Sequence, residues 1–171
     1  MRKPGTYAEG GCAHPRVAII GVGNEFRSDD GLGVLVAREL KRRMGGDFPV
    51  LEEDGEGASL MEAWKGWESV IVIDAFSSGN VPGIVHRVDA AQMPVSRGKF
   101  RCSSHAFGVA EAIEMARQLR QLPRVFLIYG IEGGSFEAGI GLSDPVVKSI
   151  PELMSSIEQE LKAIGVREGF I

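Results

Sequence analysis

Short runs of consecutive apolar residues recur along the chain, and each is followed closely by glycine or acidic residues. The clearest runs lie in the predicted strands 16–21, 70–74 and 125–130. None of them alternates between apolar and polar positions, a pattern typical of strands covered on both faces of a sheet. Residues 48–52 and 84–88 are predicted as two further strands, and the second alternates enough to lie at an edge of the sheet.

Apolar residues at helical spacing occupy the segments between these runs. Residues 32–40 carry one apolar stripe, which a glycine pair at 45–46 ends. Ser59 and Glu62 have the spacing of a capping box, so a short helix is predicted to begin at Ser59. A further helix is predicted over about 106–121.

The most regular helical pattern lies near the C-terminus. Ser143 or Asp144 is the predicted cap, and Pro145 suits the first turn. Because strands alternate with helices, we predict an α/β fold, a three-layer α/β/α sandwich around a twisted, mostly parallel sheet of about five strands with one antiparallel edge strand. The apolar positions of the last helix are Val146, Ile150, Leu153, Ile157, Leu161 and Ile164.

Composition and charge narrow the class of protein. The chain has 171 residues, which suggests a single domain, predicted over 16–171 after a flexible leader at 1–15. A net charge of −4 gives no electrostatic footprint for nucleic acid. The apolar runs are too short for membrane insertion, and the leader lacks the apolar stretch of a secretory signal. We expect a cytoplasmic monomer.

Acidic residues and a histidine occur where the predicted strands end. Asp30, Asp54 and Asp74 follow the first three strands, and His105 precedes a predicted helix. In α/β sheets, ligands bind beyond the carboxyl ends of the strands, so these side chains are expected at one edge. Carboxylate and imidazole groups suit divalent metal ions, and two carboxylates with one imidazole leave coordination positions open.

Each of these residues also has a purely structural interpretation. Asp29 and Asp30 precede a helix and could cap it, which is the interpretation that we favour for Asp29. Asp74 could hydrogen-bond near position 77, and His105 could bond to the serines before it. Asp54 precedes a glycine, and Asp-Gly is a common turn dipeptide.

Other patterns carry weaker signals. Gly21-x-Gly23 follows a strand as in dinucleotide-binding proteins, but Phe26 stands where the third glycine belongs. Cys102 lies three residues before His105, and an inert thiol is expected there rather than a nucleophile. Cys12 and His14 have the spacing of metal ligands, but disorder is expected in the glycine-rich leader that carries them, and His86 is expected at the surface.

Four motifs in order resemble one family. They are G-x-G-N with D-D-G-x-G over 21–33, I-D-A at 73–75, S-S-H-A-F-G at 103–108, and G-I followed by G-L-S over 130–143. Over about 16–161 the chain resembles the [NiFe]-hydrogenase maturation endopeptidases. The resemblance implies a peptidase that removes the C-terminal extension of a hydrogenase large-subunit precursor after nickel has been inserted.

The resemblance also implies roles for single residues. The metal-contacting positions of the family match Asp30, Asp74 and His105, and they would contact nickel carried by the precursor, or cadmium or zinc in vitro. A further acidic position matches Asp54, although Glu56 here replaces a glycine of that turn. The peptide bond would be cut by a metal-polarised water or with Asp54 or Asp74 as base. The alternatives are a non-catalytic nickel-sensing chaperone and a nucleotide-binding protein.

Overall fold

The computed structural model describes residues 17–45, 48–95 and 108–167, with no side-chain description over 165–167. In these residues one five-stranded sheet has the order β2-β1-β3-β5-β4. The four neighbouring strands β2, β1, β3 and β5 are parallel, and β4 at the edge is antiparallel to β5, as predicted. The strands are β1 (Val17–Val22), β2 (Val50–Glu53), β3 (Ser69–Phe76), β4 (Val85–Asp89) and β5 (Val125–Glu132).

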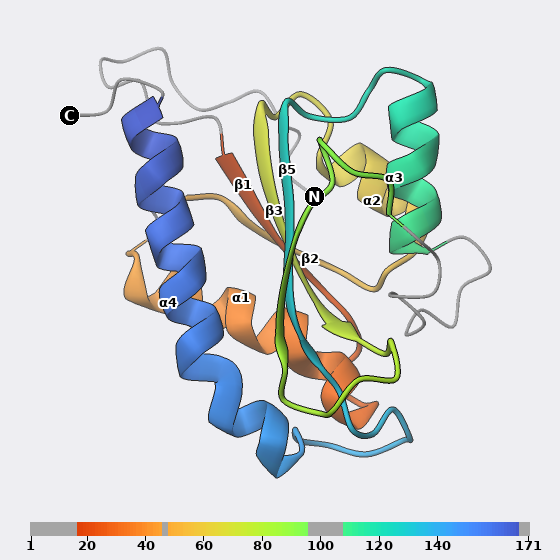
Figure 1. The fold of residues 1–171 in the computed structure, drawn as a ribbon, viewed down its shortest axis with the longest axis vertical. Coiled ribbons are helices and arrows are strands. Elements are labelled where there is room, and N and C mark those ends of the chain that lie inside the picture. The colour runs from red at the N-terminus through yellow and green to blue at the C-terminus, as the bar shows by residue number, and fades with distance from the viewer. Residues whose placement is uncertain (1–16, 46–47, 96–107, 168–171) are drawn as a thin grey trace.

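Helices cover both faces of the sheet, which confirms the predicted three layers (Figure 1). One face is covered by α1 (Leu32–Arg43) and α4 (Asp144–Arg167), and the other by α2 (Gly57–Ala63) and α3 (Val109–Gln118). The leader at 1–15, with Cys12 and His14, lies outside the described residues. None of the helices in the described ranges is both long enough and apolar enough to cross a membrane.

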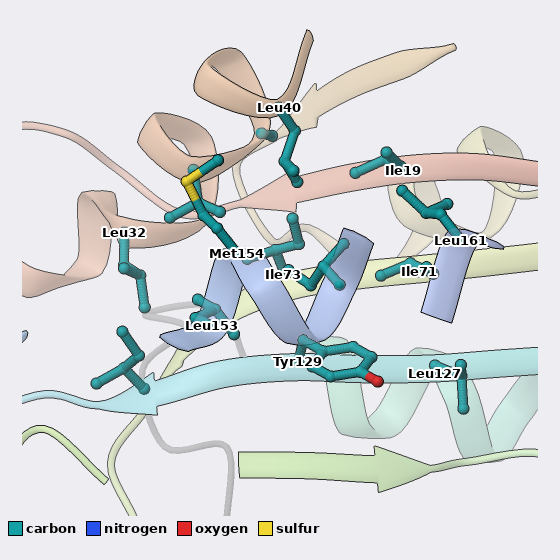
Figure 2. Close-up of a cluster of buried hydrophobic side chains, with 14 of the residues drawn as sticks. Ile19, Leu32, Leu40, Ile71, Ile73, Leu127, Tyr129, Leu153, Met154 and Leu161 are labelled. Carbon is teal, nitrogen blue, oxygen red and sulfur yellow. The ribbon is translucent and has the colours of Figure 1, made fainter. Parts of the chain in front are cut away.

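Two hydrophobic cores hold these layers together. In the first, Met154 of α4 lies near Ile73 of β3, and Leu161 of α4 lies near Ile71 of β3 (Figure 2). These side chains are almost completely buried, and burial of each stabilises the fold by about 1.5–3 kcal/mol. The second core lies under α2 and α3. Both faces of these strands are covered, which is why their sequences are apolar without alternation.

The strands β3 and β5 continue further than their sequence patterns predict. The prediction that β3 ends at Asp74 is wrong, because parallel pairing with β5 continues from Asp74↔Gly130 to Phe76↔Glu132. Asp74 therefore lies inside a strand. Side chains alternate along a strand, so Asp74 shares its face with Val72 and Phe76, which belong to the core under α2 and α3.

The start of α2 also differs from the prediction. The helix begins at Gly57, and Glu56 is its N-cap, with its carboxylate accepting a hydrogen bond from the Ser59 N–H at 2.8 Å. The predicted capping box of Ser59 and Glu62 is therefore wrong. A carboxylate at the helix N-terminus satisfies the same unpaired N–H group and also interacts favourably with the helix dipole.

Candidate active site

Glycines allow unusually close backbone packing at the carboxyl ends of β1 and β3. A Cβ atom at Gly33, in the first turn of α1, would overlap the carbonyl oxygens of Val22 and Ile73. A Cβ atom at Gly23, which has φ +135°, would overlap the carbonyl oxygen of Asp30. The glycines of the first motif therefore seat the turn that carries Asp30 directly against the strand that carries Asp74.

Two buried carboxylates, Asp30 and Asp74, lie close enough for their charges to interact. Asp30 belongs to the short 3-10 helix η1 (Ser28–Gly31) and is 7% exposed, and Asp74 is 5% exposed. Burial raises the pKa of Asp30, against the charge of Arg27 and a hydrogen bond from the Asn24 backbone. Burial and the negative charge of Asp30 raise the pKa of Asp74 to about 8, although the Ala75 N–H donates to its Oδ1 at 2.8 Å.

This arrangement favours a cationic ligand. Two neighbouring carboxylates in a buried site repel each other, and a divalent cation relieves that repulsion. Among the described residues, no hydrogen bond joins the Asp74 carboxylate to the region of position 77, which its structural interpretation required; it accepts instead from the adjacent Ala75 N–H. Asp30 makes no side-chain cap to α1. Oxygen ligands such as these suit a borderline or hard divalent ion.

His105, the predicted third metal ligand, lies outside the described residues, as does Cys102. Within the residues that the structure describes, no group of three histidine, cysteine or acidic side chains could hold a metal. Gly108, three positions after His105 in sequence, is the N-cap of α3. That end of α3 lies toward the edge where the parallel strands end (Figure 1). The role of His105 stays a prediction.

Asp54 is exposed at the carboxyl end of β2, at the same edge of the sheet but further along it. Its Oδ1 accepts a hydrogen bond from the Glu56 N–H at 2.9 Å, as expected of an Asp-Gly turn. Asp54 follows β2 and Asp74 lies in β3, and these two strands are about 10 Å apart because β1 lies between them. The structure therefore brings Asp30 to Asp74 and leaves Asp54 at the rim.

Asp29 is not the helix cap that the sequence predicts. It is fully buried, and its carboxylate binds the loop between β5 and α4. Its Oδ2 accepts from the N–H groups of Gly134 and Ser135 at 2.7 and 3.0 Å. The N–H and hydroxyl of Ser143 donate to Oδ1 and Oδ2 at 2.6 and 2.8 Å. Burial raises the pKa of Asp29, but these hydrogen bonds outweigh it and hold the pKa below its ordinary value.

The residues just before Asp29 bind the same loop. The Arg27 guanidinium donates to the carbonyl oxygen of Phe136 at 3.1 and 3.3 Å. The Ser28 hydroxyl donates to the carbonyl oxygen of Glu137 at 3.1 Å. The turn that positions Asp30 is therefore fixed to the loop that leaves β5, the strand paired with that of Asp74.

Glu132 lies at the end of β5 and is 1% exposed, but no structural or functional role was predicted for it. Its carboxylate accepts the hydroxyl and N–H of Ser78 and the N–H groups of Gly79 and Asn80. It also contacts His86 Nε2 at 3.2 Å; His86 lies in the edge strand, as predicted, but its side chain is only 20% exposed and is therefore more buried than predicted. The signal available in the sequence was an acidic residue that closely follows a buried apolar run, as Asp74 also does.

The comparisons with known proteins identify a family. The model of the family described as hydrogenase maturation protease (HycI) matches residues 34–160. The HupD hydrogenase expression/formation protein of Thiocapsa roseopersicina is 26% identical over 153 residues, which are 88% of this chain and 68% of that protein. The hydrogenase 2 maturation protease of Escherichia coli K12 is 25% identical over 154 residues, 88% of this chain and 93% of the relative.

Solved structures show the same fold. The hydrogenase maturating endopeptidase HybD of E. coli superimposes with a TM-score of 0.73 at 22% identity, over 88% of this chain and 94% of that one. The [NiFe] hydrogenase maturation protease HybD of Thermococcus kodakarensis gives a TM-score of 0.66 at 24% identity, over 85% and 99%. Together with the family match, which covers more than half of the sequence, these findings show that the chain belongs to the hydrogenase maturation protease family and is a peptidase.

Proposed function

We propose that this peptidase removes the C-terminal extension of a [NiFe]-hydrogenase large-subunit precursor and that it recognises nickel already bound to the precursor. A role as a protease of hydrogenase maturation follows from the family. Recognition of nickel is supported by the buried pair of Asp30 and Asp74, two oxygen donors held together without a cationic side chain bonded to either in the described residues.

The nickel is part of the substrate in this proposal. Asp30, Asp74 and His105 would complete the coordination of a metal that the precursor already holds. Because the pKa of Asp74 is about 8 in the free chain, its carboxyl group keeps a proton at neutral pH. Metal ligands must be deprotonated, so docking of the nickel-loaded precursor would release this proton. A precursor without nickel gains none of this interaction, which makes nickel insertion a checkpoint for cleavage.

The experiment compares purified precursor with and without nickel, incubated with wild-type protein and with His105→Ala. Intact mass spectrometry reports the cleaved extension. The proposal predicts cleavage of the nickel-loaded precursor by wild type, little cleavage of the nickel-free form, and a large loss for His105→Ala. Equal processing of both precursor forms would reject nickel recognition. Binding of the precursor without any cleavage would favour the non-catalytic chaperone.

Two routes to an activated water remain from the sequence prediction, and Asp54→Asn separates them. A general base must touch the water that attacks the peptide bond, and exposed Asp54 at the rim is accessible to substrate. If Asp54 is the base, Asp54→Asn lowers kcat at least a hundredfold and leaves KM nearly unchanged. If Asp54→Asn keeps a kcat close to that of wild type, the nickel and Asp74 activate the water.

A further inference from the structure

Strongly exposed apolar side chains lie in the loops at the edge of the sheet that carries the site. Among the described residues, the most exposed large apolar side chains are Ile140, Val81 and Phe26, at 87%, 70% and 64%. Phe26 follows β1, Val81 follows β3 and Ile140 follows β5, so all three lie in loops beyond the carboxyl ends of parallel strands. Single exposed apolar residues are ordinary, but a group of them at one site marks an interaction surface.

Phe26 and Ile140 are held side by side by backbone hydrogen bonds. The Gly139 N–H donates to the carbonyl oxygen of Phe26 at 2.9 Å, and the Ser28 N–H donates to the carbonyl oxygen of Gly139 at 2.9 Å. Arg27 and Gly139 form an isolated parallel bridge between the two segments. The two apolar side chains therefore project from adjacent, mutually fixed pieces of backbone.

The loop that carries Val81 contacts the same loop after β5. A Cβ atom at Gly134 of that loop would lie 3.4 Å from the ring of Pro82, and one at Gly83 would lie 3.0 Å from the carbonyl oxygen of Pro145, in the first turn of α4. The Gly83 N–H also donates to the carbonyl oxygen of Glu132 at 2.8 Å. The three loops therefore form one connected rim, and we call its exposed side chains Phe26, Val81 and Ile140 the apolar rim.

This rim is rigid and continuous with the carboxylate site. Phe26 is four residues before Asp30 and belongs to the turn that Asp29 and Arg27 fix to the loop after β5. A surface that is already ordered loses little conformational entropy when a ligand binds. A rigid apolar surface beside buried carboxylates suits a polypeptide that must be aligned with the metal it carries.

We propose that the apolar rim docks an apolar stretch of the precursor polypeptide next to the peptide bond that is cut. This inference rests on the proposed function, because it assigns the substrate of the same site. A peptidase has to hold its substrate chain in register with the reacting groups, and the rim borders them. A second copy of this chain fits less well, since three side chains offer only a few hundred Å² of contact against the roughly 800 Å² per partner of a stable interface.

The test measures steady-state cleavage of nickel-loaded precursor by Phe26→Ser and Ile140→Ser. Each substitution is expected to raise KM roughly tenfold and to leave kcat within about twofold, because it removes binding and no reacting group. The control is Leu119→Ser, since Leu119 is 54% exposed just after α3, away from the edge where the parallel strands end (Figure 1). Its KM should stay within about twofold of wild type. Phe26→Leu, which stays apolar, should retain most of the affinity.

Several outcomes would overturn the docking inference. An unchanged KM for both serine variants, an equal rise for Leu119→Ser, or a fall in kcat at constant KM would each do so. A wild-type dimer that Ile140→Ser dissociates in sedimentation velocity would assign the rim to self-association instead. Failure of the two ideas is distinguishable: a wild-type protein that does not cleave the precursor rejects the proposed function, whereas normal cleavage by both serine variants rejects only the docking surface.

Discussion

Replacement of Asp29 by alanine tests how the turn beside the site is held. The carboxylate of Asp29 is fully buried and accepts four hydrogen bonds from residues 134, 135 and 143, at 2.6–3.0 Å. Asp29→Ala removes the acceptor and leaves three N–H groups and one hydroxyl without it. The change therefore loosens the loop after β5 from the turn that carries Asp30.

The magnitude follows from the number and kind of these bonds. Hydrogen bonds to a charged group contribute about 1.5–3 kcal/mol each, but the effects are not additive because the loop relaxes and water enters. We therefore expect the free energy of unfolding to fall by about 3–5 kcal/mol. For a chain of this size, the melting temperature should fall by about 10 °C.

The assay is urea unfolding at neutral pH, with calorimetry for the melting temperature. Glu137→Ala is the matched control, because Glu137 is exposed in the same loop and its carboxylate has no hydrogen bond within the described ranges. The control should change the free energy of unfolding by less than about 0.5 kcal/mol. A loss below about 1 kcal/mol for Asp29→Ala would refute the reasoning.

Three further perturbations give expected outcomes. In metal-free protein, the pKa of Asp74 is about 8 in the folded state against 3.8 in the unfolded chain, so the folded state binds more protons between these pH values. The free energy of unfolding should therefore fall as the pH rises from about 4 to about 8, by up to about 1.4 kcal/mol per pH unit. Asp74→Asn should remove this slope from unfolding curves measured across that pH range. Gly33→Ala forces α1 away from Ile73, which should lower the free energy of unfolding in denaturant by about 1–3 kcal/mol and slow cleavage of the precursor. Leu35→Ala, at an exposed position of the same helix, should change neither quantity. Glu132→Ala removes the acceptor of the N–H groups at 78–80, so hydrogen exchange of that turn should accelerate at least tenfold, and unchanged protection would contradict this role.

Most of the fold was predictable because it depends on local patterns. The apolar runs of β1, β3 and β5 and the stripe of α4 are buried as their spacing indicates. The strands β3 and β5 end at Phe76 and Glu132, two residues beyond the ends that the apolar runs predict, at Asp74 and Gly130. Inside the sheet, Asp74 lies beside Asp30, and Glu132 accepts hydrogen bonds from residues 78–80.

The candidate site was predictable only in part. Asp30 and Asp74 were expected near each other because both lie toward the carboxyl ends of neighbouring parallel strands, and the negative charge of Asp30 contributes to the raised pKa of Asp74. The role of Asp29 could not be predicted, since its partners lie 105 to 114 residues away in sequence. The same holds for His86, which stacks on Phe76 with ring centroids 4.6 Å apart through pairing of β4 with β5.

The central claim is that Asp30 and Asp74 act together on one nickel ion of the precursor, and a double-mutant cycle tests it most directly. Cleavage rates of nickel-loaded precursor are measured for Asp30→Asn, Asp74→Asn and the double variant, with exposed Asp144→Asn as control. If both carboxylates act on the same ion, each single variant loses at least a hundredfold in kcat/KM, the double variant is hardly slower than either, and Asp144→Asn cleaves normally. Single variants that cleave at the wild-type rate, or losses that multiply in the double variant, would contradict it.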